Sequence, residues 1–301
     1  MHKNWLAQSA LLALLGSVAI NAHAESRLDR IKQNGEITLG YRESSIPFSF
    51  LDDDQKPIGY SIDICEGIVE ALKEQLALPE LKTKMVSVTS STRIPLVANG
   101  TVDLACGSAT NNEQRQQQVS FSPTIFVTAM RFVSLKKNNI NELEDLRGKT
   151  VVSTSGTSNL RWLTQVNVEQ KLNMRIIPAK DHAAGFLTVE SGRAHAFFMD
   201  DVLLLGLIAG SRNADQWYLS QKEYSLEPYG IIQPKGDAGF KQAVDGAVAA
   251  MMQDGRLEKI YDKWFVQAIP PKNVTLNWPM SDRLKKVFAK PTDSADPAVY
   301  Q

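Results

Sequence analysis

The sequence predicts an α/β fold built as two lobes, and three features of its 301 residues lead to this expectation. Runs of β-branched residues alternate with segments whose apolar residues recur at helical spacing, which favours sheets that are mainly parallel. This alternation occurs in two separate series along the chain. Extended segments near residues 124–134 and 222–230 separate the series, so we expect the chain to leave the first lobe, build the second and return through a two-strand hinge.

The first series opens with a helix over residues 28–34, ended by Gly35, and a strand over residues 37–41. The longest helix of the series is expected over residues 61–76, where apolar residues recur at helical spacing. The remaining expected elements are a strand at 84–88, a helix at 93–99 closed by Gly100 and a strand at 103–106.

The second series follows the same alternation, and the chain then ends in a polar tail. Residues 291–301 are rich in Pro, Ala and Asp, so we expect this tail to fray. The expected strands are 124–134, 150–153, 174–177, 196–199, 217–219 and 229–233, and the expected helices are 143–147, 158–172, 182–191, 202–209, 240–252 and 257–265.

The N-terminus predicts export. Residues 1–24 combine a short basic start, an apolar run and the small-x-small sequence Ala22-His23-Ala24, which is typical of a secretory signal peptide cleaved before Glu25. We therefore expect residues 1–24 to be the signal peptide, residues 25–126 plus 226–301 to form the first lobe, and residues 127–225 to form the second.

Charge and cysteine content exclude several classes of function. The 33 basic and 33 acidic side chains balance and form no basic stripe, so no nucleic-acid partner is expected. Cys65 and Cys106 would reach an oxidising compartment, where they could form a disulfide or remain two buried thiols. Neither cysteine has a histidine or second cysteine at metal spacing, so we expect no metal and no cofactor.

Polar side chains follow the strands at the positions where open α/β sheets bind ligands. Together they supply cations, hydroxyls, backbone amides and one carboxylate, which is the set an α-amino acid requires. A carboxylate binds an arginine fork and helix-terminal amides, and an ammonium binds a carboxylate. These strand-end residues are Arg42, Ser108 to Thr110, Arg115, Ser155 to Ser158, His182 and Asp200.

Several segments resemble a known family. Residues 40–50 (GYRESSIPFSF) resemble the opening strand of the family 3 amino-acid-binding proteins. The glutamate/aspartate-binding branch of that family is similar in TSSTRIPL (89–96), CGS (106–108), TNNEQR (110–115), SGT (155–157), AKDH (179–182), FMDD (198–201), YDKWF (261–265) and IPPKN (269–273). The resemblance implies a type II periplasmic-binding-protein-like fold and a periplasmic, monomeric subunit of an ABC importer that delivers glutamate or aspartate to a membrane permease.

The same resemblance implies a role for ten residues. Arg115, Thr110 and the amides of Thr157 and Ser158 would hold the α-carboxylate of the ligand, while Asp200, with Ser108 and Thr110, would hold its ammonium. The side-chain carboxylate would be received by Arg42, Ser90, Arg93 and His182. The chain departs from the branch at Ala109 and Ser158, where the branch often has threonine.

Each role has a structural alternative. An arginine could be a solvated surface charge, and His182 could lie near a helix start without a partner. Asp200 could cap the next helix, although Asp201 is the expected cap, and Thr157 could cap the helix that follows it.

Other functional classes lack support in the sequence. It contains no G-x-S-x-G elbow, no H-E-x-x-H pair and no phosphate loop, so we do not expect an enzyme. The alternatives are a periplasmic enzyme similar to cyclohexadienyl dehydratase and a sensory ligand-binding module. Glutamate and aspartate differ by one methylene, worth about 1–3 kcal/mol, and the sequence does not separate them.

Overall fold

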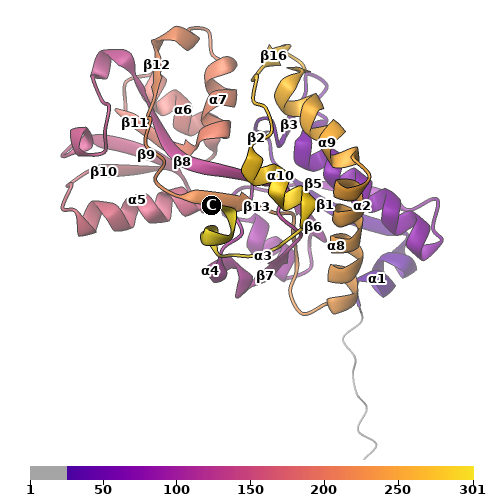
Figure 1. The fold of residues 1–301 in the computed structure, drawn as a ribbon. Helices are drawn as coiled ribbons and strands as arrows, with labels where there is room; N and C mark the ends of the chain where they lie inside the picture. The colour runs from indigo at the N-terminus through magenta and orange to yellow at the C-terminus, as the bar shows by residue number, and fades with distance from the viewer. Residues whose placement is uncertain (1–25) are drawn as a thin grey trace, which may run out of the picture.

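The computed structural model describes residues 26–301 (Figure 1). The signal peptide predicted at residues 1–24 therefore lies outside the described residues. Two separate sheets confirm the predicted two-lobed α/β fold. We call the five-stranded sheet and the helices packed on it the first lobe, and the six-stranded sheet with its helices the second lobe.

The sheet of the first lobe has the strand order β5-β1-β6-β14-β7. Strand β1 pairs in parallel with β5 and β6, whereas β14 is antiparallel to β6 and β7. The bounds are β1 (Glu36–Tyr41), β5 (Lys82–Ser87), β6 (Leu104–Cys106), β7 (Val119–Phe121) and β14 (Ile232–Pro234), with a small separate sheet of β2 (Ser44–Ser45), β3 (Ser49–Leu51) and β4 (Pro57–Ile58).

The sheet of the second lobe has the order β10-β9-β11-β8-β12, with β13 paired to β8. Strand β9 is parallel to β10 and β11, while β8 is antiparallel to β11, β12 and β13. The bounds are β8 (Phe126–Leu135), β9 (Thr150–Thr154), β10 (Arg175–Ala179), β11 (Ala196–Asp200), β12 (Trp217–Leu219) and β13 (Leu226–Tyr229). Each sheet thus contains one reversed strand near a crossover, β14 in the first lobe and β8 in the second, while its other strands run in one direction, as predicted.

Helices flank both sheets, and most begin or end within a few residues of their expected positions. The α-helices are α1 (Arg27–Asn34), α2 (Tyr60–Leu76), α3 (Arg93–Ala98), α4 (Glu113–Gln116), α5 (Ser158–Glu169), α6 (His182–Glu190), α7 (Asp201–Ala209), α8 (Ala238–Gln253), α9 (Arg256–Tyr261) and α10 (Asp282–Ala289). Shorter elements are η1 (Lys136–Asn138), η2 (Glu144–Leu146), η3 (Ala214–Gln216), the π-helical turn η4 (Asp262–Val266), η5 (Pro297–Tyr300) and the hairpin β15 (Ala268–Ile269) and β16 (Val274–Thr275). Among these described helices, none is long and apolar enough to cross a membrane.

Two strands connect the lobes. Strands β8 and β13 run antiparallel, with Ala129 opposite Leu226 and Phe126 opposite Tyr229, and they cross between the two halves in Figure 1. Strand β13 lies within the predicted crossover at residues 222–230, and β8 overlaps the one at 124–134 and ends one residue beyond it. The polar side chains that follow the strands of either sheet therefore face a common space between the lobes.

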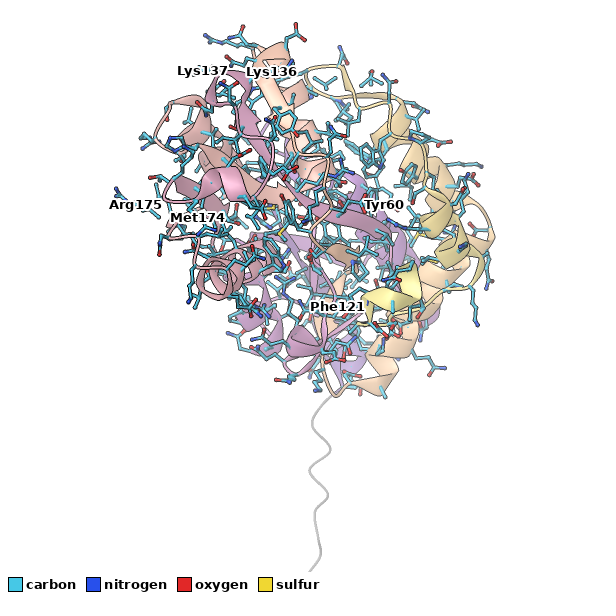
Figure 2. All side chains as sticks on the ribbon, turned by 60° about the vertical axis from the view of Figure 1, so that its left-hand side comes forward. Tyr60, Phe121, Lys136, Lys137, Met174 and Arg175 are labelled. Carbon is cyan, nitrogen blue, oxygen red and sulfur yellow. A yellow bond between two sulfur atoms is a disulfide. The ribbon has the colours of Figure 1, made fainter. Side chains whose placement is uncertain are left out.

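A buried aromatic cluster holds the start of β8 in the first lobe. The ring of Phe126 packs on Phe48 and Phe265 at centroid distances of 5.0 Å and 4.8 Å. Tyr60 packs on Phe265 at 5.1 Å, and its hydroxyl donates to the carbonyl of Ile125 at 2.7 Å. In Figure 2, Tyr60 lies in the body of the molecule, whereas Lys136 and Lys137 lie at the outer end of the second lobe.

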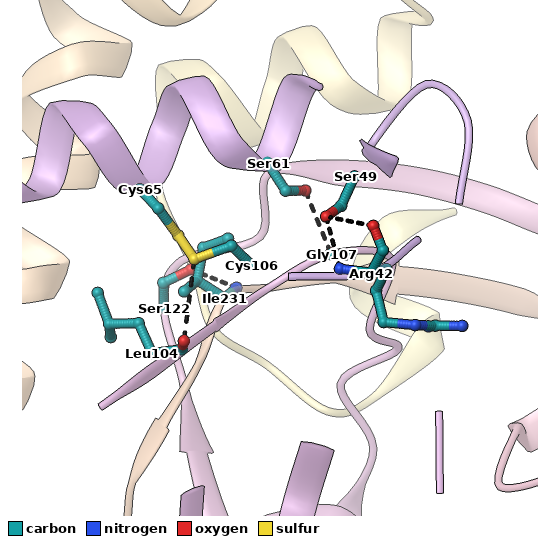
Figure 3. Close-up of a disulfide and its surroundings, with 9 residues drawn as sticks. All are labelled: Arg42, Ser49, Ser61, Cys65, Leu104, Cys106, Gly107, Ser122 and Ile231. Atoms are coloured by element: carbon teal, nitrogen blue, oxygen red, sulfur yellow. Dashed lines mark hydrogen bonds between the residues drawn. A yellow bond between two sulfur atoms is a disulfide. The ribbon is translucent and has the colours of Figure 1, made fainter. Parts of the chain in front are cut away.

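A disulfide joins Cys65 to Cys106, with a Cα–Cα distance of 6.3 Å (Figure 3). Of the two alternatives open from the sequence, the structure shows the disulfide. The bond ties α2 to the last residue of β6. Gly107 and Ser108, which follow at once, lead into the site described below, so the disulfide anchors one wall of that site.

The expectation that residues 291–301 fray is wrong. The carbonyl of Thr292 accepts from the backbone amide of Thr124 at 2.7 Å, and the carbonyl of Asp293 accepts from the side-chain amide of Asn111 at 2.8 Å. Tyr300 is buried, and its hydroxyl lies 2.8 Å from that of Thr124. Composition suggested disorder, but the tail finds hydrogen-bond partners that only the folded first lobe supplies.

Candidate ligand-binding site

One small cavity lies between the lobes and gathers eight of the ten predicted residues. From the first lobe it is lined by Arg93, Ser108, Thr110 and Arg115, and from the second by Thr157, Ser158, His182 and Asp200. Asn159, Met199 and Leu203 complete the lining. Arg42 and Ser90 are not part of the lining, but both side chains are buried nearby.

Arg42 directly follows β1 and is only 2% exposed. Its backbone amide donates to the hydroxyl of Ser49 at 2.8 Å (Figure 3), which fixes the chain where the strand ends. A Cβ atom at position 107 would lie 2.9 Å from Cγ of Arg42, so Gly107 provides the space for this side chain. The Nη1 atom of Arg42 is buried without a hydrogen-bond partner.

Arg93 and Ser90 come from the turn that starts α3. The guanidinium of Arg93 donates from Nη1 to the carbonyl of Ser108 at 2.6 Å, while its Nε has no partner. The hydroxyl of Ser90 is likewise buried without a partner. Burial, and then the charges of Arg115 and Arg42, hold the pKa of Arg93 well below its ordinary value. The cations therefore repel one another unless an anion joins them.

His182 is the first residue of α6 and is 2% exposed. Its Nδ1 lies 2.9 Å from the hydroxyl of Thr154, and its Nε2 has no partner. Asp181, rather than His182, caps the helix by accepting from the amide of Ala184 at 2.8 Å. Burial, and then the charges of Arg42 and Arg93, lower the pKa of His182, so its ring is neutral near pH 7.

Arg115 bridges the two lobes. It lies on α4, which Asn112 caps, and its Nη1 donates to the carbonyl of Thr110 at 2.7 Å. Its Nη2 donates to the carbonyl of Gly156 in the second lobe at 3.1 Å. A guanidinium buried at the lobe boundary is positioned to bind a carboxylate with two parallel bonds.

The start of α5 supplies the opposite wall. The hydroxyl of Thr157 accepts from the amide of Leu160 at 3.1 Å and donates to the carbonyl of Thr154 at 2.6 Å, so this side chain caps the helix, as one alternative supposed. The neighbouring hydroxyl of Ser158 lies 3.2 Å from that of Thr110, across the boundary between the lobes.

Asp200 ends β11 and is 3% exposed. Its carboxylate accepts from Asn159 at 2.6 Å and from the hydroxyl of Tyr229. Burial, and then the charge of Glu227, raise the pKa of Asp200 to about 7. Its side chain makes no capping bond to α7, so the capping alternative does not hold.

Asp201 is not the expected cap of α7 either. It is the first residue of that helix and accepts from the hydroxyl of Thr128 at 2.5 Å and the amide of Val202 at 2.7 Å, and it pairs with Arg131. Asp201 therefore anchors α7 to β8, and Asp200 alone faces the cavity.

Three polar residues of the site were missed by the analysis of the sequence. Asn159 and Tyr229 hold Asp200, and Glu227 accepts from Ser158 at 2.8 Å. Neither the amide of Asn159 on its helix nor the phenol of Tyr229 in its strand belongs to a sequence pattern that indicates a binding role, so the sequence alone could not identify them. Glu227 left one usable signal, since it is one of two acids, with Glu223, within the predicted second crossover.

Two α/β lobes joined by two strands, with a polar cavity between them, define a type II periplasmic binding protein. Residues 37–267 match bacterial extracellular solute-binding proteins, family 3, and the chain belongs to that family. The prediction of a binding protein rather than an enzyme is confirmed by its relatives.

The most similar relatives compared span almost the whole chain. An L-glutamate/L-aspartate-binding protein of Pseudomonas aeruginosa is 50% identical and covers 96% of both chains. A glutamate/aspartate import solute-binding protein of Escherichia coli is 48% identical over 96% of this chain and 95% of its own. Among solved structures, an ancestral arginine-binding protein bound to arginine superposes with a TM-score of 0.69 at 28% identity, covering 77% of this chain and 98% of its own.

Proposed function

We propose that this chain is the periplasmic substrate-binding subunit of an ABC importer and captures L-glutamate or L-aspartate. The observation that carries the proposal is a set of four buried polar atoms without hydrogen-bond partners: Arg42 Nη1, Ser90 Oγ, Arg93 Nε and His182 Nε2. Buried polar groups are normally hydrogen-bonded. These four belong to the residues that the family resemblance assigns to the ligand's side-chain carboxylate, so an acidic side chain would satisfy them together.

The net charge of the site supports the same ligand class. Arg42, Arg93 and Arg115 contribute three positive charges, and Glu227 and the ionised form of Asp200 contribute two negative ones, so the buried set then carries 3 − 2 = +1. Glutamate and aspartate carry two carboxylates and one ammonium, a net charge of −1, and would neutralise the site. A neutral amino acid would leave one buried charge uncompensated, which costs several kcal/mol.

The remaining roles follow from the placement of the groups around the cavity. Arg115, with Thr110 and the amides of Thr157 and Ser158, would bind the α-carboxylate at the start of α5, where the helix dipole favours an anion. Asp200, with Ser108 and Thr110, would bind the ammonium. The raised pKa of Asp200 indicates a carboxyl group whose ionised form gains stability when a cation joins it.

We further propose that the lobes close on the ligand about β8 and β13, with residues 25–126 plus 226–301 moving against residues 127–225. Two sites of close approach support this. A Cβ at position 156 would lie 2.6 Å from Cα of Ser91, and one at position 206 would lie 2.9 Å from the carbonyl of Ile46. A ligand that contacts both lobes stabilises the closed form, which a permease could then recognise on a monomer.

Calorimetry with glutamate, aspartate, glutamine and asparagine tests the proposal. We expect the two acids to bind and the two amides to bind at least about 100-fold more weakly, because an amide forfeits two charge-assisted hydrogen bonds worth about 1.5–3 kcal/mol each. Arg115→Met is the comparison variant. It should lose the binding of all four ligands, because Arg115 is assigned to the α-carboxylate that they share. Equal affinity for glutamate and glutamine in the wild type would overturn the assignment.

A further inference from the structure

Glu227 is a buried carboxylate on one of the two strands that connect the lobes. It lies on β13 opposite Thr128 of β8 and is 5% exposed. One carboxylate oxygen accepts from the hydroxyl of Ser158 at 2.8 Å, and the other accepts from the hydroxyl of Ser225 at 2.5 Å. The side chain is thus held from both sides and cannot turn to solvent without breaking these bonds.

This carboxylate is linked to the cavity by one hydroxyl. Ser158, its partner, lines the cavity and lies 3.2 Å from Thr110 of the first lobe. The charge of Glu227 also acts on two charged groups of the cavity, Arg115 and Asp200. It is the strongest influence that raises the pKa of Arg115 against burial, and after burial it is the strongest that raises the pKa of Asp200.

Glu227, like Asp200, differs from the other two buried acids of the lobes. Asp103 pairs with Arg27 at 3.2 Å and also with Arg30, and Asp201 pairs with Arg131 at 3.5 Å. Within residues 26–301, no basic side chain forms an ion pair with Glu227. A carboxylate that is buried without its own cation acts on the arginines and the ligand of the neighbouring cavity instead.

We propose that Glu227 is a specificity-determining residue that acts through Ser158 and through its charge to make the site select an acidic amino acid over a dicarboxylate that lacks the ammonium. This inference rests on the proposed function and adds to it the reason why the ligand must be a zwitterion. Glu227 is a positioning residue, because it contacts Ser158 and not the cavity itself.

The charge count gives the direction of the effect. With Glu227 present and Asp200 ionised the buried set carries +1, so glutamate, at −1, leaves the closed site neutral, whereas glutarate, at −2, leaves it at −1 unless Asp200 takes up a proton. With glutamine at position 227 the set carries +2, so glutamate leaves +1 and glutarate leaves the site neutral. The preference between the two ligands should therefore move toward glutarate.

Glu227→Gln is the variant that tests the proposal, because glutamine has nearly the same shape and can still accept from Ser158. Calorimetry at about pH 7.5 gives the dissociation constants of glutamate and glutarate, and their ratio is the readout. We expect the ratio to shift by about tenfold or more toward glutarate, as expected for one unit charge acting across a site with an effective dielectric constant of about 20.

Two further variants separate charge from shape. Glu223→Gln removes the same charge from a carboxylate that is 41% exposed and pairs with Arg131, and should leave the ratio unchanged. Glu227→Asp keeps the charge and should keep the wild-type preference for glutamate even where both ligands bind more weakly. Circular dichroism verifies folding, and Glu227→Leu serves as a second neutral variant if the glutamine variant does not fold.

The outcomes distinguish this inference from the proposed function. A wild-type protein that binds neither glutamate nor aspartate contradicts the proposed function itself. A wild type that binds glutamate, with neutral variants that weaken both ligands by the same factor, overturns the role of Glu227 alone. A shift of the same size in the Glu227→Asp variant would also overturn the role of Glu227, because the shape of the side chain rather than its charge would then determine the ratio of the two dissociation constants.

Discussion

Replacing Arg93 with methionine removes one of the three buried guanidinium groups and keeps an unbranched side chain of similar length. In the structure this group donates to the carbonyl of Ser108 at 2.6 Å, and its Nε is left for a ligand. The substitution removes one hydrogen bond from the unliganded protein but also a buried charge and its repulsion by the other cations; burial, and then Arg115 and Arg42, lower the pKa of Arg93. We therefore expect the melting temperature to shift by less than about 4 °C.

The effect on binding should be far larger and should depend on the ligand's charge. A pair of unit charges about 4 Å apart contributes about 4 kcal/mol at an effective dielectric constant of about 20, so the affinity for glutamate should fall by about 100-fold to 1000-fold. The side chain of glutamine carries no charge, so its affinity should fall by less than about tenfold, since a single hydrogen bond contributes about 1 kcal/mol.

Calorimetry with glutamate and glutamine on both proteins measures the change in preference. The matched control is Arg175→Met, which removes an exposed cation from β10. It should change neither affinity by more than about twofold, because exposed charges contribute little. Equal losses for glutamate and glutamine in Arg93→Met would refute the assignment of Arg93 to the side-chain carboxylate.

Three further predictions concern closure, stability and pH. Gly206→Ala should stabilise the unliganded helix by up to about 1 kcal/mol yet weaken glutamate binding, because its Cβ would lie 2.9 Å from the carbonyl of Ile46 in the closed form; unchanged affinity by calorimetry would contradict the closure. Replacing both Cys65 and Cys106 with serine should lower the free energy of unfolding, measured in urea, by about 2–4 kcal/mol, since the bond closes a loop of 41 residues; an unchanged midpoint would be the contrary result. Glutarate brings no ammonium to Asp200, whose pKa burial raises to about 7, so this carboxyl must take up a proton as the site closes. Glutarate affinity should therefore be about tenfold higher at about pH 6 than at about pH 8, Asp200→Asn should abolish that dependence, and a pH-independent affinity in the wild type would argue against it.

The sequence predicted the architecture well, because local patterns encode it directly. The alternation of strand and helix, the two extended crossovers and the polar residues after the strands all arise from neighbours in the chain. The one reversed strand in each sheet was not predicted, because strand direction in β14 and β8 depends on where each strand returns to its sheet. The C-terminal tail was mispredicted for a similar reason, since Tyr300 finds its partner Thr124 only in the folded lobe.

The site shows the same division between local and tertiary information. The ten predicted ligand-binding residues follow from strand ends and from the family resemblance, and eight of them line one cavity. The carboxylate of Glu227 and the phenol of Tyr229 enter the site because β13 passes between the lobes. Which side of a connecting strand faces a cavity depends on its pairing with β8, which the sequence of β13 alone does not specify.

A crystal structure of the protein in complex with glutamate tests the central claim most directly, namely that a cluster from the first lobe and His182 receives an acidic side chain. We predict that the γ-carboxylate lies within about 2.7–3.2 Å of donors from Arg42, Ser90, Arg93 and His182, with the ammonium on Asp200. A γ-carboxylate that points to solvent, with these four side chains still unpaired, would contradict the account.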